Sequence, residues 1–255
     1  MPKHTGFLTY LLAQFPALRE NAENVGKSVM NSTPVEYRGL EPLFMSLLVM
    51  LVVIFMASQV RKTLTNLEAG VVPDDTLTLR TFFEAFFGYF YGMAKDVMGP
   101  VNAKRYFPLI GACAAFIFFS NACGLIPGLN PPTSSLNVTL GCAVVVFLAF
   151  NYYGLKENGV GYLKHMAGPM LALAPLIFLI EVISTCVRPI TLSLRLMLNI
   201  AVDHLVVSIF AGLLVLFVPI PFMMLGILVI IVQTLVFCLL SSIYIGLATE
   251  KADHH

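Results

Sequence analysis

The sequence predicts an all-α integral membrane protein with five membrane helices, the last two long and tilted, and one interfacial amphipathic helix. The first observation is composition: 58% of the 255 residues are hydrophobic and only 11% are charged, whereas a soluble domain carries roughly 25% charged residues. The second is a series of long apolar runs, and the third is a phenylalanine-rich amphipathic stretch before the second run. So few charges cannot cover a water-exposed globule, which excludes a soluble protein.

Five apolar runs approach or exceed the length of about 20 residues that a helix needs to cross a bilayer. The predicted membrane helices cover about residues 43–60, 107–126, 138–155, 170–217 and 222–248. The fourth run is too long for one upright crossing, so we expect it to tilt strongly or to bend near Pro189. The stretch VPIP at 218–221 separates the last two runs. Residues 1–42 are then a segment outside the membrane, and residues 43–255 form the membrane domain.

Residues 76–98 have a different pattern from the five runs. One stripe of the predicted helix carries Arg80, Glu84, Gly88 and Lys95, and the other side carries Phe82, Phe83, Phe86 and Phe90. This pattern is typical of a helix that lies in the membrane interface instead of crossing it. A soluble amphipathic helix is the alternative, which so many phenylalanines beside a membrane span disfavour.

Lysine and arginine residues near the spans predict the orientation, because positive charges gather on the cytoplasmic side. Five crossings place the two termini on opposite sides of the membrane. With the N-terminus outside and the C-terminus cytoplasmic, nine lysines and arginines lie on the cytoplasmic side and four lie outside. The apolar stretch near the N-terminus is broken by Gln14 and Pro16, so we expect no signal peptide.

The cysteines and the net charge limit the classes of ligand. Each of the five cysteines stands singly among apolar residues, with no CxxC pair and no cluster with histidine: Cys113, Cys123, Cys142, Cys186 and Cys238. Small hydrophobic side chains in helices are the ordinary interpretation. We therefore expect no disulfide, metal site or cofactor. The net charge of +1 argues against nucleic acid.

The fourth apolar run holds five ionisable residues: Glu181, Arg188, Arg195, Asp203 and His204. Each charge within a bilayer costs about 2.5–3.5 kcal/mol on insertion scales, so such residues often have a function. Glu181 and Arg188 also admit a purely structural role, because they are seven residues apart on one helix face and could pair. Arg188 could alternatively bind carbonyls that a kink at Pro189 frees.

Arg195 has no such local explanation. Its neighbours three and four positions away are Thr191, Leu192, Leu198 and Asn199, none of which is acidic. At 1.5 Å per residue Glu181 is about 21 Å away along the helix axis, and Asp203 is about 12 Å away and turned aside. An arginine cannot shed its charge to escape this cost. We therefore expect its countercharge to be a carboxylate on another subunit.

Several motifs resemble subunit a of the F-type rotary ATP synthases. They are RPITLSLRLMLNI around Arg195, FSNACGLIPG ending at Gly128, VVVFLAFNYYGLKENGVGYLKHMAGP at 144–169, and VQTLVFCLLSSIYIGLATE near the C-terminus. They follow the family order over about residues 36–250, which makes the resemblance highly specific.

The resemblance implies a non-catalytic stator subunit whose two offset half-channels pass protons to and from carboxylates of a rotating c-ring. Arg195 matches the arginine that faces the ring and blocks a direct leak between the half-channels. The outer path matches Asn121, Asn199, His204 and Gln233, and the path on the ATP-making side matches Glu181 and Ser184. The implied partners are the c-ring, the subunit b peripheral stalk, other ATP synthase subunits and membrane lipid.

This sequence departs from the family pattern at three positions. Leu198 replaces a glycine, Gly226 replaces a residue that is sometimes titratable, and Asp203 replaces a small residue before His204. Asp203 therefore shares the proton-relay role in the outer path with His204, and the sequence does not divide that role between them. It also leaves open whether the ion is a proton or sodium. The long N-terminal segment and Gly226 favour the plasma (inner) membrane of a bacterium.

Two other classes of membrane protein are alternatives. A stand-alone ion-coupled transporter would need its own carboxylate near Arg195, and none is predicted in any other span. A haem or quinone redox subunit is disfavoured because His204 stands alone and His165 falls in a cytoplasmic loop, so no pair of histidines could ligate iron axially.

Overall fold

The computed structural model describes residues 41–64, 78–126, 129–159, 161, 174–213 and 219–249. This part of the chain is built from α-helices joined by loops and two short 3-10 helices, which confirms the predicted all-α class. Five helices in it are long and apolar enough to cross a membrane: α3 (Glu41–Leu64), α5 (Leu79–Ala122), α6 (Leu136–Asn158), α8 (Ala174–Leu213) and α9 (Pro219–Thr249). The predicted outside segment at 1–42 falls almost wholly beyond the described residues.

The predicted interfacial helix and the second predicted span are two parts of α5. They meet at Gly99, whose φ of 78° and ψ of 164° break the helix. Glycine accepts this left-handed φ without a Cβ clash, and Pro100 then starts the second part, where its missing N–H costs no hydrogen bond. The second part therefore begins at Pro100, earlier than the predicted residue 107. The interfacial location of the first part stays a prediction.

The first part of α5 folds back onto the second through phenylalanine rings. Phe86 lies 5.2 Å from Phe118 between ring centroids, and Phe83 lies 6.1 Å from Phe119. The predicted polar stripe is wrong at Arg80, which is buried and bonds Glu84 at 2.8 Å, while Phe82 is exposed. The buried face of this part is set by tertiary contacts, such as those of Phe83 and Phe86 with the second part, and not by its own periodicity alone.

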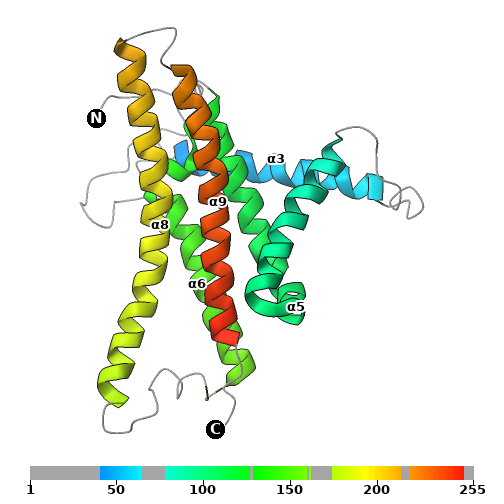
Figure 1. Cartoon of the computed structure of the whole chain (residues 1–255), viewed down its shortest axis with the longest axis vertical. Helices are drawn as coiled ribbons and strands as arrows, with labels where there is room; N and C mark the ends of the chain where they lie inside the picture. The colour runs from blue at the N-terminus through cyan, green and yellow to red at the C-terminus, as the bar shows by residue number, and fades with distance from the viewer. Residues whose placement is uncertain are drawn as a thin grey trace, which may run out of the picture.

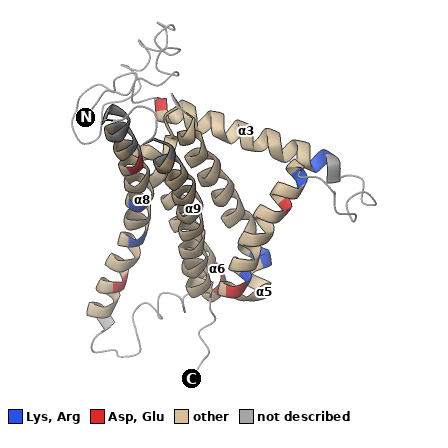
Figure 2. Cartoon of the chain, turned by 45° about the horizontal axis from the view of Figure 1, so that its top comes forward, with Lys and Arg blue, Asp and Glu red and all other residues tan. Residues whose placement is uncertain are grey.

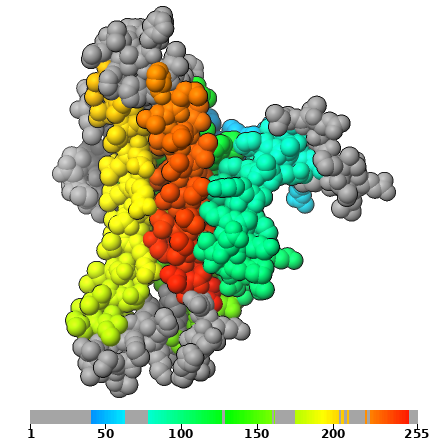
Figure 3. Space-filling view, viewed as in Figure 1, coloured from blue at the N-terminus to red at the C-terminus, as the bar shows by residue number. Residues whose placement is uncertain are grey.

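The second part of α5 packs with α6, α8 and α9 in a bundle, and α9 contacts all three partners. Figures 1 and 3 show α8 and α9 side by side along the long axis of the molecule. Helix α3 lies across that axis in Figure 1 and contacts α5 and the 3-10 helix η3 (Pro132–Ser134). A second 3-10 helix, η2 (Cys123–Leu125), follows α5. The charged helix α8 therefore lies at one side of the bundle, with α9 beside it and α6 behind them in Figure 1.

Helices α8 and α9 are too long to stand upright in a bilayer. With 40 and 31 residues they are about 60 Å and 46 Å long, against a hydrocarbon core of about 30 Å. Helix α8 continues through Pro189 as one helix, and a helix of this length must tilt or bend to stay within a membrane. The strong tilt or the bend near Pro189 stays a prediction. Helix α9 begins at Pro219, inside the VPIP stretch that was predicted to separate the runs.

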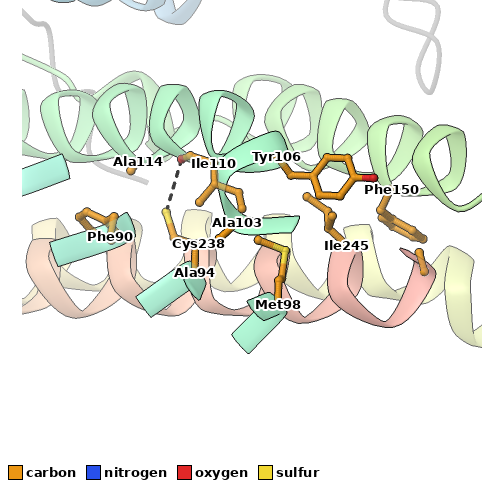
Figure 4. Packing of buried hydrophobic residues seen from close by; sticks show 11 residues of the cluster. Phe90, Ala94, Met98, Ala103, Tyr106, Ile110, Ala114, Phe150, Cys238 and Ile245 are labelled. Atoms are coloured by element: carbon orange, nitrogen blue, oxygen red, sulfur yellow. Dashed lines mark hydrogen bonds between the residues drawn. The ribbon is translucent and has the colours of Figure 1, made fainter. Parts of the chain in front are cut away.

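Two apolar clusters form the core. The first, which we call the C-terminal cluster, packs the two parts of α5 against the C-terminal half of α9 and includes Phe90, Tyr106, Phe150 and Cys238 (Figure 4). In Figure 4 the Cys238 thiol points at the carbonyl oxygen of Ile110, 3.9 Å away. The second, the central cluster, joins all four helices of the bundle and consists of Ile117, Ala143, Val146, Leu192, Leu196 and Phe237.

Candidate ion-translocation site

The charges of the described chain are distributed unevenly among the helices. Helix α9 has none, and those of α6 lie at its C-terminal end, whereas α8 carries Glu181, Arg188, Arg195 and Asp203 along its length (Figure 2). On α8, Arg188 forms an ion pair with Glu181 and lies over the ring of Tyr244 of α9. Helix α5 carries charges as well, at Arg80, Glu84, Lys95, Asp96, Lys104 and Arg105, but α8 is the helix on which charges and the predicted site residues coincide.

Arg195 lies on a face of α8 that the described chain leaves uncovered. Its side chain is exposed, as are those of Leu194, Leu198 and Val202 around it. Within the described residues it makes no hydrogen bond and no ion pair. In this part of the chain no acid of α8 pairs with Arg195, and a countercharge on another subunit stays a prediction. The guanidinium is thus a fixed charge on a mainly apolar outer surface, with the polar side chains of Thr191 and Asn199 one helical turn to either side.

Glu181 and Arg188 form the pair that the seven-residue spacing allowed. An Arg188 guanidinium nitrogen (Nη2) donates to Oε1 of Glu181 at 3.3 Å. The same guanidinium lies 5.2 Å from the ring centroid of Tyr244 on α9, which is a cation–π distance. Ser184 lies on α8 between them, exposed. Tyr244 was missed by sequence reasoning, because nothing in the sequence fixes which α9 residue faces Arg188.

Asn199 and Gln233 are brought together from α8 and α9. The amide nitrogen of Asn199 donates to Oε1 of Gln233 at 2.7 Å, and Gln233 is 2% exposed. The amide nitrogen of Gln233 is buried without a partner. Buried polar atoms of this kind are usually satisfied by ordered water, so this pair marks a place where water belongs.

Asn121 lies at the end of α5 in a second polar group. Its side-chain oxygen accepts a hydrogen bond of 2.6 Å from the hydroxyl of Thr133 in η3, and both residues are buried. The amide nitrogen of Asn121 and the hydroxyl of Ser120 are buried without a partner. Thr133 and Ser120 were not predicted; the uncharged loop that holds Thr133 gave no signal beyond its polarity.

Asp203 lies on α8 opposite Gly226 of α9. A Cβ placed on Gly226 would lie 3.0 Å from Oδ2 of Asp203, which is tighter than most real Cβ contacts and would make the carboxylate shift by a few tenths of an ångström. The departures from the family pattern at Asp203 and Gly226 are therefore linked in the structure, because the Asp203 carboxylate occupies space that a side chain at position 226 would need. The backbone of His204 is helical in α8, and its side chain lies outside what the structure describes.

A comparison with protein families decides which family has this arrangement. The model of the family described as "ATP synthase A chain" matches residues 43–246, most of the chain. The chain belongs to the ATP synthase A chain family. Curated relatives agree with this: a subunit a of ATP synthase from Sorangium cellulosum is 73% identical over the full length of both chains.

More distant relatives match most of their length as well. One from Bdellovibrio bacteriovorus is 44% identical over 76% of this chain and 84% of its own. Another, from Pelobacter propionicus, is 45% identical over 68% of this chain and 76% of its own. The resemblance inferred from the motifs is therefore confirmed, and the protein is a multi-pass membrane component of the ATP synthase family.

Proposed function

We propose that this chain is the non-catalytic stator ion-channel subunit of an F-type ATP synthase, which couples ion flow to rotation of a c-ring. The observation that carries the proposal is Arg195: an exposed cation on a mainly apolar face of α8, which within the described residues makes no ion pair and has Thr191 and Asn199 as its polar neighbours. A bilayer makes such a charge costly, by about 2.5–3.5 kcal/mol. A carboxylate on a neighbouring subunit would offset that cost, and the family gives each c-subunit one.

Arg195 can act on a passing carboxylate in a way that lipid cannot. Lipid favours the neutral acid because it cannot solvate the ion, whereas a guanidinium beside it favours the ionised form. A proton is therefore released near Arg195 and regained on the other side of it. The drive is about 2.3 kcal/mol per elementary charge for each 100 mV of membrane potential.

The polar residues of the described chain supply the two paths. Asn121, Asn199, Asp203 and Gln233 form the outer path together with His204. The buried amide nitrogens of Asn121 and Gln233, which have no partner among the described residues, support water there. Glu181 and Ser184 form the path on the ATP-making side. The distribution along α8 supports this division, since on this helix Arg195 lies between Glu181 and Ser184 on one side and Asn199, Asp203 and His204 on the other.

A stand-alone transporter is the weaker interpretation. It would need its own acid beside Arg195, and the described residues place no carboxylate within ion-pair distance of it.

Helix α3 also has a surface that could contact other subunits, because its Leu47, Leu51 and Phe55 are exposed. We propose that the exposed side of α3 faces subunit b of the peripheral stalk and lipid.

We propose that the N-terminus lies outside and the C-terminus in the cytoplasm of a bacterial plasma membrane. The ion pair between Arg105 and Glu157 joins the start of the second part of α5 to the end of α6, where basic residues gather. Single cysteines at Asn24 and Asp253, with the five native cysteines replaced, should react with an impermeant reagent from opposite sides of the membrane. Reaction of both from the outside would contradict the orientation.

Glu181→Gln should slow ion-driven ATP synthesis by at least about tenfold, because positioned proton-transfer groups contribute about 10²–10⁴-fold. The measurement is ATP synthesis and proton pumping in membrane vesicles, with the complex purified to show that all subunits remain. Glu84→Gln is the matched control, since Glu84 is also an exposed acid bound to an arginine of its own helix. Unchanged pumping in Glu181→Gln would leave Glu181 only the structural role of holding Arg188.

A further inference from the structure

The interior of the bundle contains an apolar layer between the two sets of polar residues. We propose that this layer, the central cluster, is a dry seal that stops protons from passing through the interior of the chain at the level of Arg195. The proposal rests on the proposed function, because it concerns the separation of the two paths. It assigns to Phe237, Leu196 and Ile117 a role that Arg195 alone cannot fill, since Arg195 lies on the outer face.

The register of α8 against α9 places the layer between the polar sets. The two helices touch through Asn199 and Gln233 at one level, and through Arg188 and Tyr244 at another. The two levels are eleven positions apart on α8 and also eleven positions apart on α9, which is about 16 Å at 1.5 Å per residue. The helices therefore run antiparallel with no slip in register between these contacts.

The same register places Phe237 level with Arg195. Both residues are four positions from the Asn199–Gln233 contact, one along α8 and the other along α9. Arg195 is exposed on the outer face of α8, while Phe237 is fully buried in the bundle. At this level the outside of α8 carries a fixed positive charge, and the inside carries a phenyl ring.

The packing of the layer leaves no room on its inner side for water. Phe237, Leu196 and Ile117 are 0% exposed, and Leu192 and Val146 are 2% exposed. These side chains come from all four helices of the bundle and contact one another as one cluster. An interior packed in this way with apolar atoms stays dry.

Buried hydroxyl groups near the layer do not bridge it. Ser193 donates to the carbonyl of Ile190, and Ser241 donates to the carbonyl of Phe237. Thr234 donates to the carbonyl of Ile230 in the same way. Each hydroxyl proton is thus held by its own helix, so none of the three offers it to a neighbouring helix.

The buried polar atoms without partners all lie on one side of the layer. Among the described residues they belong to Ser120, Asn121 and Gln233. Asn121 and Gln233 are each one helical turn beyond a member of the cluster, Ile117 on α5 and Phe237 on α9. Water that satisfies these atoms would reach the layer from the outer path and end there.

A polar side chain in the layer should therefore open a leak while Arg195 is intact. Phe237→Asn replaces the ring with a smaller amide that can hold water, so passive proton uptake should rise at least about tenfold, a factor that corresponds to about 1.4 kcal/mol of barrier. The measurement is proton uptake, under an imposed potassium diffusion potential and without nucleotide, in vesicles that contain the whole complex.

Two controls separate the seal from general damage. Phe237→Leu keeps the site apolar and should leave proton uptake near the wild-type rate. Phe150→Asn makes the same change at a residue that is 2% exposed but belongs to the C-terminal cluster, outside the layer and one helical turn beyond Val146 on α6. It should reduce stability without opening a leak. If Phe237→Asn does not assemble, Leu196→Gln tests the same layer with a side chain of similar length.

The outcomes distinguish the seal from the proposed function. A leak in Phe237→Asn or Leu196→Gln, absent from both controls, supports the seal. An assembled Phe237→Asn or Leu196→Gln complex that is as tight as wild type overturns it, as does an equal leak in Phe150→Asn. ATP synthesis by the wild-type vesicles under the same potential, and its loss in Arg195→Ala, tests the proposed function separately, whatever the seal variants do.

Discussion

Replacing Arg195 with alanine should abolish coupled ATP synthesis and leave insertion and assembly largely intact. The side chain is exposed and bonds nothing in the described chain, so its removal breaks no internal contact. Removal also relieves a membrane-embedded charge that costs about 2.5–3.5 kcal/mol. Passive proton uptake should rise, because the outer face of α8 loses the charge that separates the two half-channels. ATP synthesis and proton uptake in vesicles measure the two effects.

Arg195→Lys should fail as well, although it keeps a cation. Lysine can lose its proton when it is desolvated, and it lacks the planar fork with which a guanidinium holds a carboxylate. ATP synthesis in Arg195→Lys should therefore be far below wild type, with assembly unchanged. A lysine variant with wild-type synthesis would show that only the sign of the charge matters.

The second large effect is expected when Asp203 and His204 are replaced together. We expect His204→Ala to make activity depend more steeply on the outside pH, with Asp203 partly compensating, because histidine titrates near neutral pH and suits a relay. Asp203→Asn/His204→Ala should be far worse than either single variant, because members of one relay are not additive. Proton-driven ATP synthesis at several outside pH values measures this.

Gly226→Ala is the control for the Asp203 and His204 variants, because Gly226 neighbours Asp203. Gly226→Ala would press a methyl group toward the Asp203 carboxylate, 3.0 Å away, without removing a titratable group. It should disturb the outer path less than the double replacement does. Mild losses that add up across Asp203→Asn and His204→Ala would instead indicate that these residues only pack.

The five long helices could be predicted from the sequence, because an uninterrupted apolar run of membrane length is typical of a membrane helix. The errors of the sequence prediction lie where one helix contacts another. Arg80 is buried, and Phe86 packs on Phe118 of the second part of α5, neither of which periodicity within 76–98 reveals. The start of the second part at Pro100 likewise follows from Gly99, whose positive φ allows the break.

The candidate site could be predicted where it depends on one helix. The isolation of Arg195 followed from the absence of acids three and four positions away, and the pairing of Glu181 with Arg188 from their spacing. Contacts between helices could not be predicted, because they depend on register. Gln233 with Asn199, Tyr244 with Arg188, and Thr133 with Asn121 all meet across helices or loops.

The most direct test of the central claim is ATP synthesis by assembled complexes that carry Arg195→Ala. Vesicles with wild-type and variant complexes are given the same imposed ion gradient, and co-purification of the remaining subunits verifies assembly in both. The account predicts that the wild type makes ATP, while the fully assembled variant makes none and leaks protons. ATP synthesis at the wild-type rate by the assembled variant would contradict the assignment of this chain as the rotary stator.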